Sequence, residues 1–292
     1  MSVNITQFQQ KLTYNNISKN IGEIFQDLDK IAQLDKWAEK KESQWQIILI
    51  LSIIGIISST FLIAFIPPLG IILLPVSIIM VIIGGIQVYK YNRLNIQNYR
   101  YEVTKKILTM VNRDRQGGSD INLQINFSAS TAKEKCISTI DHPLRSGWKI
   151  QIFKDEWLTL TSIFLDGSNF NLTATNTYQI VSGWKRASSG KNKHKSKTKS
   201  KGTTINLTLD YPVNKYGALK ILKNEAETAI KLPAGVLRKR LQITDKHIKL
   251  TAKMPNNSGE NTETIYQTVT MMFLSIYQVL NLAKMLSKKT NK

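Results

Sequence analysis

The chain has 292 residues, and 40 Lys and Arg residues against 20 Asp and Glu residues give it a formal net charge of +20. Such a charge indicates an anionic partner, which could be a membrane leaflet, an acidic protein or nucleic acid. A single cysteine, Cys136, excludes an internal disulfide framework, and residues 1–38 hold no apolar segment typical of a signal peptide.

The first segment, residues 1–45, is predicted to be an amphipathic helical arm. Its apolar residues recur every three or four positions and form a seam of Ile17, Ile21, Ile24, Leu28 and Ile31. This seam could pack against a helix that follows the membrane segment. Alternatively, it could join copies of the chain in a homo-oligomer.

Residues 46–89 contain no charged side chain and are predicted to form a transmembrane helical hairpin. Its two spans, 46–66 and 69–89, each have about the 20 residues that cross a hydrocarbon core of about 30 Å. Two buried helices of a soluble protein are not expected, because soluble helices of this length carry polar residues on at least one face. Pro67 and Pro68 are expected to break the helix at the bend.

The orientation of the hairpin is predicted from the charges at its ends. The bend carries none, whereas Lys40, Lys41, Lys90 and Arg93 flank the opposite ends. The positive-inside rule therefore places both termini in the cytoplasm, at a bacterial inner membrane or an equivalent one. Residues expected at the membrane interface are Trp45, Tyr89, Lys90, Tyr91 and Arg93.

Small residues within the hairpin are expected to let the two helices approach closely. These candidates are Ser52, Gly55, Ser58, Ser77 and Gly84, with Ser58 level with Ser77 and Ser52 level with Gly84. A conduction path normally needs ionisable residues within the membrane, and none occurs here. The hairpin is therefore interpreted as an anchor, and an oligomeric pore remains an alternative.

Residues 90–117 are predicted to form a juxtamembrane helix, which Gly117 and Gly118 would end. Arg100, Lys105 and Lys106 in this helix would suit anionic headgroups. From residue 118 the apolar residues alternate with polar ones, which is typical of antiparallel strands with one buried face. Strands are expected at 121–128, 148–153, 157–165, 170–184 and 203–212, with a turn at 154–156.

The C-terminal third is predicted to contain a helix at 214–231, two short strands around residues 244–246 and a long final helix. The apolar stripe of the final helix is expected to pack across the sheet, and it comprises Ile265, Val269, Met272, Ile276, Val279 or Leu280, and Ala283. The predicted fold class is thus an α+β membrane protein. A two-helix transmembrane hairpin with flanking amphipathic helices precedes a cytoplasmic, mainly antiparallel β-sheet domain, residues 118–292, that the C-terminal helix closes.

A Lys-rich segment, residues 185–202, lies between two of the predicted strands. Lysine occupies every second position from Lys191 to Lys201. The segment could be a disordered loop, or it could extend the hairpin so that lysines about 6.7 Å apart share one face. Neighbouring lysines at that spacing repel each other by about 0.6 kcal/mol in water. Disorder is therefore expected in the absence of an anionic partner.

The candidate anionic-surface residues are the cations of this segment and of a second basic run, namely Lys185, Arg186, Lys191, Lys193, Lys195, Lys197, Lys199, Lys201, Arg238, Lys239 and Arg240. Because the domain would be tethered to a bilayer, anionic lipid or an acidic protein is favoured as the partner over nucleic acid. Each lysine close to an anionic leaflet contributes about 1 kcal/mol to binding.

No motif indicates catalysis, a metal site or a cofactor. The three histidines, His142, His194 and His247, are far apart in the sequence, and neither a phosphate-binding loop nor a nucleophile elbow occurs. The adjacent acids Asp155 and Glu156 are interpreted as turn residues. The predicted function is a non-enzymatic, membrane-anchored cytoplasmic binding or scaffold module. Alternatives are an oligomerising two-helix membrane effector controlled by a β-rich sensor domain, and nucleic-acid binding at the membrane.

Overall fold

The computed structural model describes residues 4–18, 20–186, 188–217, 219, 222–256 and 260–290. It consists of two compact units. The hairpin unit comprises Asn4–Gln10 and Gln26–Asn98, and the sheet unit comprises Lys11–Phe25 and the chain from Tyr99 onward.

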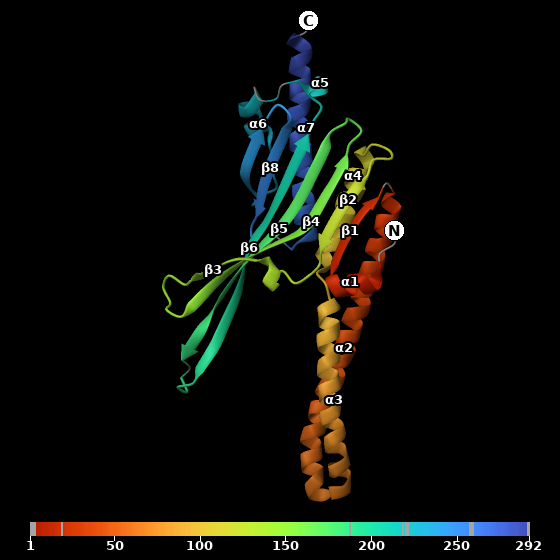
Figure 1. The fold of residues 1–292 in the computed structure, drawn as a ribbon, viewed down its shortest axis with the longest axis vertical. Coiled ribbons are helices and arrows are strands. Elements are labelled where there is room, and N and C mark those ends of the chain that lie inside the picture. Colours follow the sequence, from red (N-terminus) through yellow and green to blue (C-terminus); the bar gives the residue numbers. More distant parts are fainter. Residues whose placement is uncertain are drawn as a thin grey trace. The chain divides into compact units, whose positions relative to one another are not determined.

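The fold is α+β, with long apolar helices, an antiparallel sheet and a C-terminal helix, which confirms the predicted class at this level (Figure 1). Among the residues that the structure describes, three helical stretches are long and apolar enough to cross a membrane: Ile21–Phe65, Pro67–Asp114 and Thr262–Leu286. The first two contain the uncharged segment identified in the sequence.

The hairpin unit is built on α2 (Ile21–Phe65) and α3 (Pro67–Leu94), and it also holds most of α1 (Ile5–Lys11). Only Ile66 separates α2 from α3, so the bend is tighter than predicted. Pro67 and Pro68 occupy the first positions of α3 instead of a loop. Proline suits these positions because its fixed φ is helical and its missing N–H would have had no partner there.

This tight bend sets which small residues meet. A Cβ atom at Gly55 would lie 2.7 Å from Oγ of Ser77, and one at Gly84 would lie 3.4 Å from Cβ of Leu49. Ser52 is buried, but the residue that meets Gly84 is Leu49. Ser58 is exposed, and its hydroxyl donates to the backbone oxygen of Ile54. The partner of Ser77 is therefore Gly55 and not Ser58, because the shorter bend shifts the register of the two helices.

Gly70 gives the hairpin its closest helix contact and a direct test. A Cβ atom there would lie 2.6 Å from the backbone nitrogen of Ile63, which cannot move without bending the helix. We expect Gly70→Ala to destabilise the hairpin by about 1–3 kcal/mol. The measurement is SDS titration of the purified full chain, with energy transfer between dyes on α2 and α3. Gly85→Ala is the matched control, since its Cβ would meet only Leu49 Cδ1 at 4.0 Å.

The two arms of the hairpin unit also contact each other outside the uncharged segment, at the end remote from the bend. The rings of Trp37 and Tyr91 meet edge to face at 5.3 Å, and the buried carboxylate of Asp35 accepts a hydrogen bond from the Ile96 N–H at 2.9 Å. The chain leaves helical conformation after α3 and re-enters it in α4 (Asn98–Asp114). The predicted single juxtamembrane helix is therefore interrupted between α3 and α4. The Asp35 carboxylate accepts a hydrogen bond from the backbone N–H of Ile96 in this interruption.

The N-terminal arm differs from the prediction, because it is not helical throughout. Thr13–Ser18 forms strand β1, and Ile17, which was placed in the helical seam, is 64% exposed on it. The stretch Thr-Tyr-Asn-Asn-Ile-Ser combines β-formers with poor helix formers, which explains the outcome. From Ile24 onward the seam is correct, since Ile24, Leu28 and Ile31 are buried.

The sheet unit contains one antiparallel sheet with the strand order β1-β2-β4-β5-β6-β8-β7, and β3 pairs with β4 outside this path. Its strands after β1 are β2 (Ile121–Asn126), β3 (Cys136–Asp141), β4 (Trp148–Ile163), β5 (Asn169–Arg186), β6 (Asn192–Asp210), β7 (Leu237–Ile243) and β8 (His247–Met254). A short 3-10 helix, η1 (Lys133–Lys135), precedes β3.

One face of the sheet forms the core. The alternating residues Ile121, Leu123 and Ile125 of β2 are buried, as predicted. The C-terminal helix α7 (Thr262–Thr290) buries its predicted stripe, in which both Val279 and Leu280 are inaccessible. The chain after Pro212 forms two short helices, α5 (Val213–Tyr216) and α6 (Lys223–Ala229), in place of the single helix predicted there.

Candidate anionic-surface binding site

The candidate site is the basic flap, which we define as β3 together with residues 148–153 of β4, 178–186 of β5 and 192–200 of β6. These strand ends pair with one another and extend beyond the part of the sheet that lies along α7 (Figure 1).

Irregularities in three neighbouring strands separate the flap from the rest of the sheet. The registers shift at Trp157 of β4 and at Thr177 of β5, where the facing β6 residues are Lys201 and Gly202. Gly202 has a φ of +94°, and a Cβ atom there would lie only 2.3 Å from the backbone oxygen of Met254. Bulges increase the local twist and bend a sheet. Because these irregularities lie in neighbouring strands, the strand ends that form the flap turn away from the direction of the rest of the sheet.

Residues 192–202 of the Lys-rich segment belong to strand β6 and are not the disordered loop expected from the charge. Lys193, Lys195, Lys197 and Lys199 pair respectively with Lys185, Gly183, Val181 and Gln179 of β5. Because directly opposed residues share a face, four lysines of β6 and Lys185 project from one side of the flap. All five are exposed, so water and salt can screen their repulsion, and three of the four β6 lysines face an uncharged residue.

The same face carries apolar side chains next to the lysine row. The register places Trp148 opposite Gly183, and Ile150 opposite both Val181 and Ile140. The ring of Trp148 lies across Gly183, since a Cβ atom on this glycine would be 2.5 Å from the indole. This lysine face of the flap is therefore amphipathic, with a cationic row on β6 and an apolar strip on β3 and β4, and Gly183 and Val181 of β5 lie between them.

The flap tip adds further exposed apolar groups. Leu144, in the loop between β3 and β4, is 89% exposed, and Trp184 is 65% exposed with its ring 5.4 Å from that of His194. The guanidinium of Arg145 lies 4.9 Å from the Trp148 ring centre. Sequence reasoning missed Leu144, Arg145 and the apolar strip, because only the pairing of β3 and β4 with β5 brings these segments into the flap. Trp184 and His194 lie on the face opposite the lysine row.

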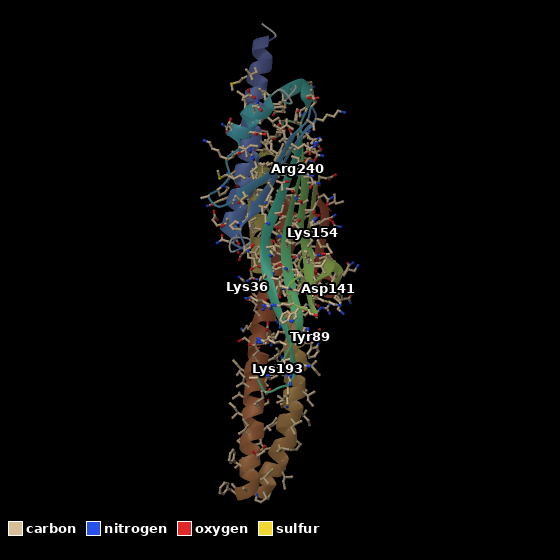
Figure 2. All side chains as sticks on the ribbon, turned by 90° about the vertical axis from the view of Figure 1, so that its left-hand side faces the viewer. Lys36, Tyr89, Asp141, Lys154, Lys193 and Arg240 are labelled. Atoms are coloured by element: carbon tan, nitrogen blue, oxygen red, sulfur yellow. The ribbon has the colours of Figure 1, made fainter. Side chains whose placement is uncertain are left out.

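The other predicted cations lie in two places. Arg186, Lys191 and Lys201 belong to the flap or its ends and are exposed. Arg238, Lys239 and Arg240 are also exposed, but they lie on β7, which β8 separates from β6. Figure 2 shows Lys193 and Arg240 at different levels of the sheet. The structure thus gathers the lysine row and leaves the β7 cluster as a separate basic patch.

A buried ion cluster lies where the flap joins the rest of the sheet. Asp155 is fully buried and contacts two cations: Nη2 of Arg100 at 2.6 Å and Nζ of Lys135 at 2.7 Å. Arg100 also donates to Oγ of Ser130 at 2.8 Å and to the backbone oxygen of Asn126. The cluster joins α4, η1 and β4 through charges that water does not reach.

These contacts correct two sequence interpretations. Arg100 cannot serve anionic headgroups, because its side chain is completely buried. Asp155 and Glu156 lie within the continuous strand β4 and not in a turn, with Asp155 buried and Glu156 exposed. A charged residue is accepted in the middle of this strand because Arg100 and Lys135 neutralise it.

A second buried hydrogen-bond chain continues the cluster across the sheet. Asn176 of β5 donates to the hydroxyl of Tyr99 at 2.8 Å and accepts from the hydroxyl of Thr203 at 2.7 Å. Burial raises the pKa of Tyr99, which keeps its phenol protonated at neutral pH. The first turn of α4 is therefore fixed to β4, β5 and β6 by polar contacts that the sequence pattern did not reveal.

Lys135 makes the cluster sensitive to pH. Burial lowers its pKa below the ordinary lysine value of 10.5, although Asp155 opposes this shift. Between the lowered pKa and 10.5 the unfolded chain binds more protons, so the stability contributed at Lys135 rises with pH. We expect the wild type to gain stability over Lys135→Met on going from neutral to alkaline pH, as measured by urea unfolding. Lys133→Met, at an exposed neighbour, should show no such trend.

Within the described part of the chain, no group of three or more His, Cys, Asp or Glu side chains could hold a metal ion. A scan against protein-family models and searches of curated proteins and of solved structures found no match to the chain.

Proposed function

We propose that the chain is a non-enzymatic, membrane-anchored binding module whose basic flap contacts the anionic lipid of the leaflet beside its anchor. The observation that carries this proposal is the lysine face of the flap, which carries the β6 lysine row and, across β5, the apolar strip of Trp148, Ile150 and Ile140, of which Ile140 is half exposed and Ile150 is buried. Cations beside apolar and aromatic groups suit the boundary between headgroups and acyl chains.

The anchor in this proposal is the hairpin of α2 and α3. Residues 46–89 carry no charge, and the helix surfaces expose aliphatic side chains such as Ile54, Ile72 and Ile86, each more than half exposed. Of the three apolar helices, α7 is the one that buries its stripe within the sheet unit, so we assign only two spans. Lys40, Lys41, Lys90 and Arg93 at the open end support a cytoplasmic position for both termini under the positive-inside rule.

The tether favours lipid over the other anionic partners. The larger segment of the sheet unit begins at Tyr99, five residues after α3 ends at Leu94. A domain joined so closely to a membrane helix always has lipid headgroups at high local concentration. An acidic protein or nucleic acid would have to diffuse to the same place.

A capture experiment tests the flap. The full chain is placed in nanodiscs of neutral lipid, and vesicles of phosphatidylglycerol or of phosphatidylcholine are added and sedimented. We expect phosphatidylglycerol vesicles to carry the nanodiscs into the pellet at low salt and high salt to release them in part. Equal sedimentation with both vesicle types contradicts the proposal. In a parallel run with an oligonucleotide, binding of the oligonucleotide without capture by anionic vesicles also contradicts it.

The orientation has its own test. Tags on the two ends of the chain should be protected from external protease in sealed cells and digested after the cells are opened. Digestion of either tag in sealed cells would contradict cytoplasmic termini without bearing on the lipid preference of the flap.

A further inference from the structure

A cavity of about 410 Å³ lies in the sheet unit at the end of β4 remote from the flap. It is lined by the last turns of α4, the connection between β4 and β5, α5 and the middle of α7. The volume is within the usual range for small-molecule sites. Leu274, which lines the cavity, is 64% exposed, so the cavity opens to solvent.

The charge of the cavity is opposite to that of the chain. Among the described residues that line it, the charged ones are Asp114 and Asp166, although basic residues outnumber acidic ones by 40 to 20 overall. Lys215 lies beside the cavity, with its Nζ 3.3 Å from the backbone oxygen of Asp166 and 6.0 Å from the Tyr216 ring centre, and it does not belong to the lining.

Asp166 is held in place by a hydrogen-bond network. Its Oδ2 accepts from the hydroxyl of Tyr216 at 2.6 Å and from that of Ser168 at 2.9 Å, and its Oδ1 accepts from the Ser168 N–H at 2.8 Å. Burial raises the pKa of Asp166, but these donors outweigh burial and lower it overall. The carboxylate is therefore ionised and oriented at neutral pH.

Aromatic rings form much of the remaining wall. Phe164 meets Phe273 edge to face at 5.6 Å and Tyr277 at 6.0 Å. The pKa of Tyr277 is raised by burial and by the nearby Asp166, so its phenol stays neutral. An ionised carboxylate beside neutral aromatic faces attracts a cation that also has an apolar body, because such faces carry negative partial charge.

We propose that this cavity binds a monovalent organic cation with an apolar body, such as a substituted ammonium ion. The site is separate from the basic flap, and the proposal does not depend on lipid binding. An anionic ligand would meet Asp114 and Asp166 without a lining cation to balance it.

The test titrates the full chain in nanodiscs by calorimetry with benzyltrimethylammonium, benzyl alcohol and phenylacetate, which share an aromatic body and differ in charge. We expect saturable binding of the cation, about tenfold weaker binding of the alcohol and none of the anion. Asp166→Asn should weaken cation binding by about tenfold and leave the alcohol unaffected.

Two further variants keep the test decisive. Asp114→Asn removes the charge of an exposed carboxylate in the lining and should also weaken binding of the cation. This variant serves even if Asp166→Asn does not fold. Asp141→Asn, an exposed acid of the flap, is the matched control and should leave the affinity unchanged. The proposal is overturned if the cation gives no saturable heat, if the alcohol or the anion binds equally well, or if neither lining variant weakens the cation.

Discussion

Replacement of Arg100 by methionine is expected to lower the free energy of unfolding of the sheet unit by about 3–5 kcal/mol. The guanidinium is inaccessible to solvent and lies 2.6 Å from a carboxylate oxygen of Asp155, which is equally buried. Methionine fills much of the space but leaves the carboxylate with Lys135 as its one remaining cationic partner in the cluster. The cost is the loss of the charged hydrogen bonds that the guanidinium donates to Asp155, to Ser130 and to the backbone oxygen of Asn126, which are left in a site that water does not reach.

The measurement is urea unfolding of the full chain, followed by near-ultraviolet circular dichroism of the buried aromatic residues. Arg113→Met is the matched control, because Arg113 lies on the same helix and is exposed. It should change the stability by no more than about 0.5 kcal/mol. A small effect of Arg100→Met, equal to that of the control, would show that the cluster does not stabilise the unit.

A double-mutant cycle separates the ion pair from packing. Asp155→Leu alone leaves Arg100 and Lys135 buried without their acid, so it should be strongly destabilising. The double variant Arg100→Met/Asp155→Leu should be more stable than the sum of the single changes predicts, because fewer buried charges remain unpaired. Additive effects would mean that the two side chains act through packing alone.

This cluster also shows where sequence reasoning stops. Strand periodicity located most of the sheet, since alternating apolar residues such as Ile121, Leu123 and Ile125 must share a buried face. The same reasoning read Asp155, together with Glu156, as a turn residue, because two adjacent acids on a strand would point to opposite faces. The cationic partners of Asp155 are Arg100 and Lys135, which lie 55 and 20 residues earlier in the chain. No local sequence pattern predicts such a pairing.

The candidate site was predictable in composition but not in geometry. The alternation of lysines identified the cationic row and allowed the ribbon that the structure contains, yet the estimated repulsion favoured disorder. That estimate omitted the pairing of Lys193, Lys195, Lys197 and Lys199 with β5, and it omitted the apolar strip on the same face. Register depends on pairing between strands, so Trp148 and Ile140 could not be placed on the same face as Lys195 and Lys197 from spacing alone.

Replacing Lys193, Lys195 and Lys197 with glutamine is expected to weaken capture of phosphatidylglycerol vesicles by about a hundredfold. Each lysine near an anionic leaflet contributes about 1 kcal/mol, and about 3 kcal/mol corresponds to roughly two powers of ten in affinity. The side chains are exposed, so their replacement should not alter the fold. The measurement is the vesicle concentration that sediments half of the nanodisc-bound full chain.

The matched control changes the same number of charges elsewhere in the sheet unit. Lys215, Lys231 and Lys246 are exposed and lie outside the flap, so glutamine at all three removes an equal net charge. If capture depended only on total charge, both triple variants would lose affinity alike. We expect the control to lose much less, because its lysines share no face with the apolar strip.

The apolar side chains of the flap should contribute to vesicle binding separately from the lysines, and the dependence of binding on salt distinguishes the two contributions. Ile140→Ser and Leu144→Ser keep every charge of the flap, and they remove an exposed residue of the apolar strip and the exposed leucine of the loop that joins β3 to β4. Salt screens attraction between exposed charges but not the burial of apolar surface. These variants should therefore bind nearly as well as the wild type at low salt and detach more completely at high salt. If both variants keep the wild-type salt dependence, the flap contacts headgroups through its lysines alone and its apolar side chains stay in water.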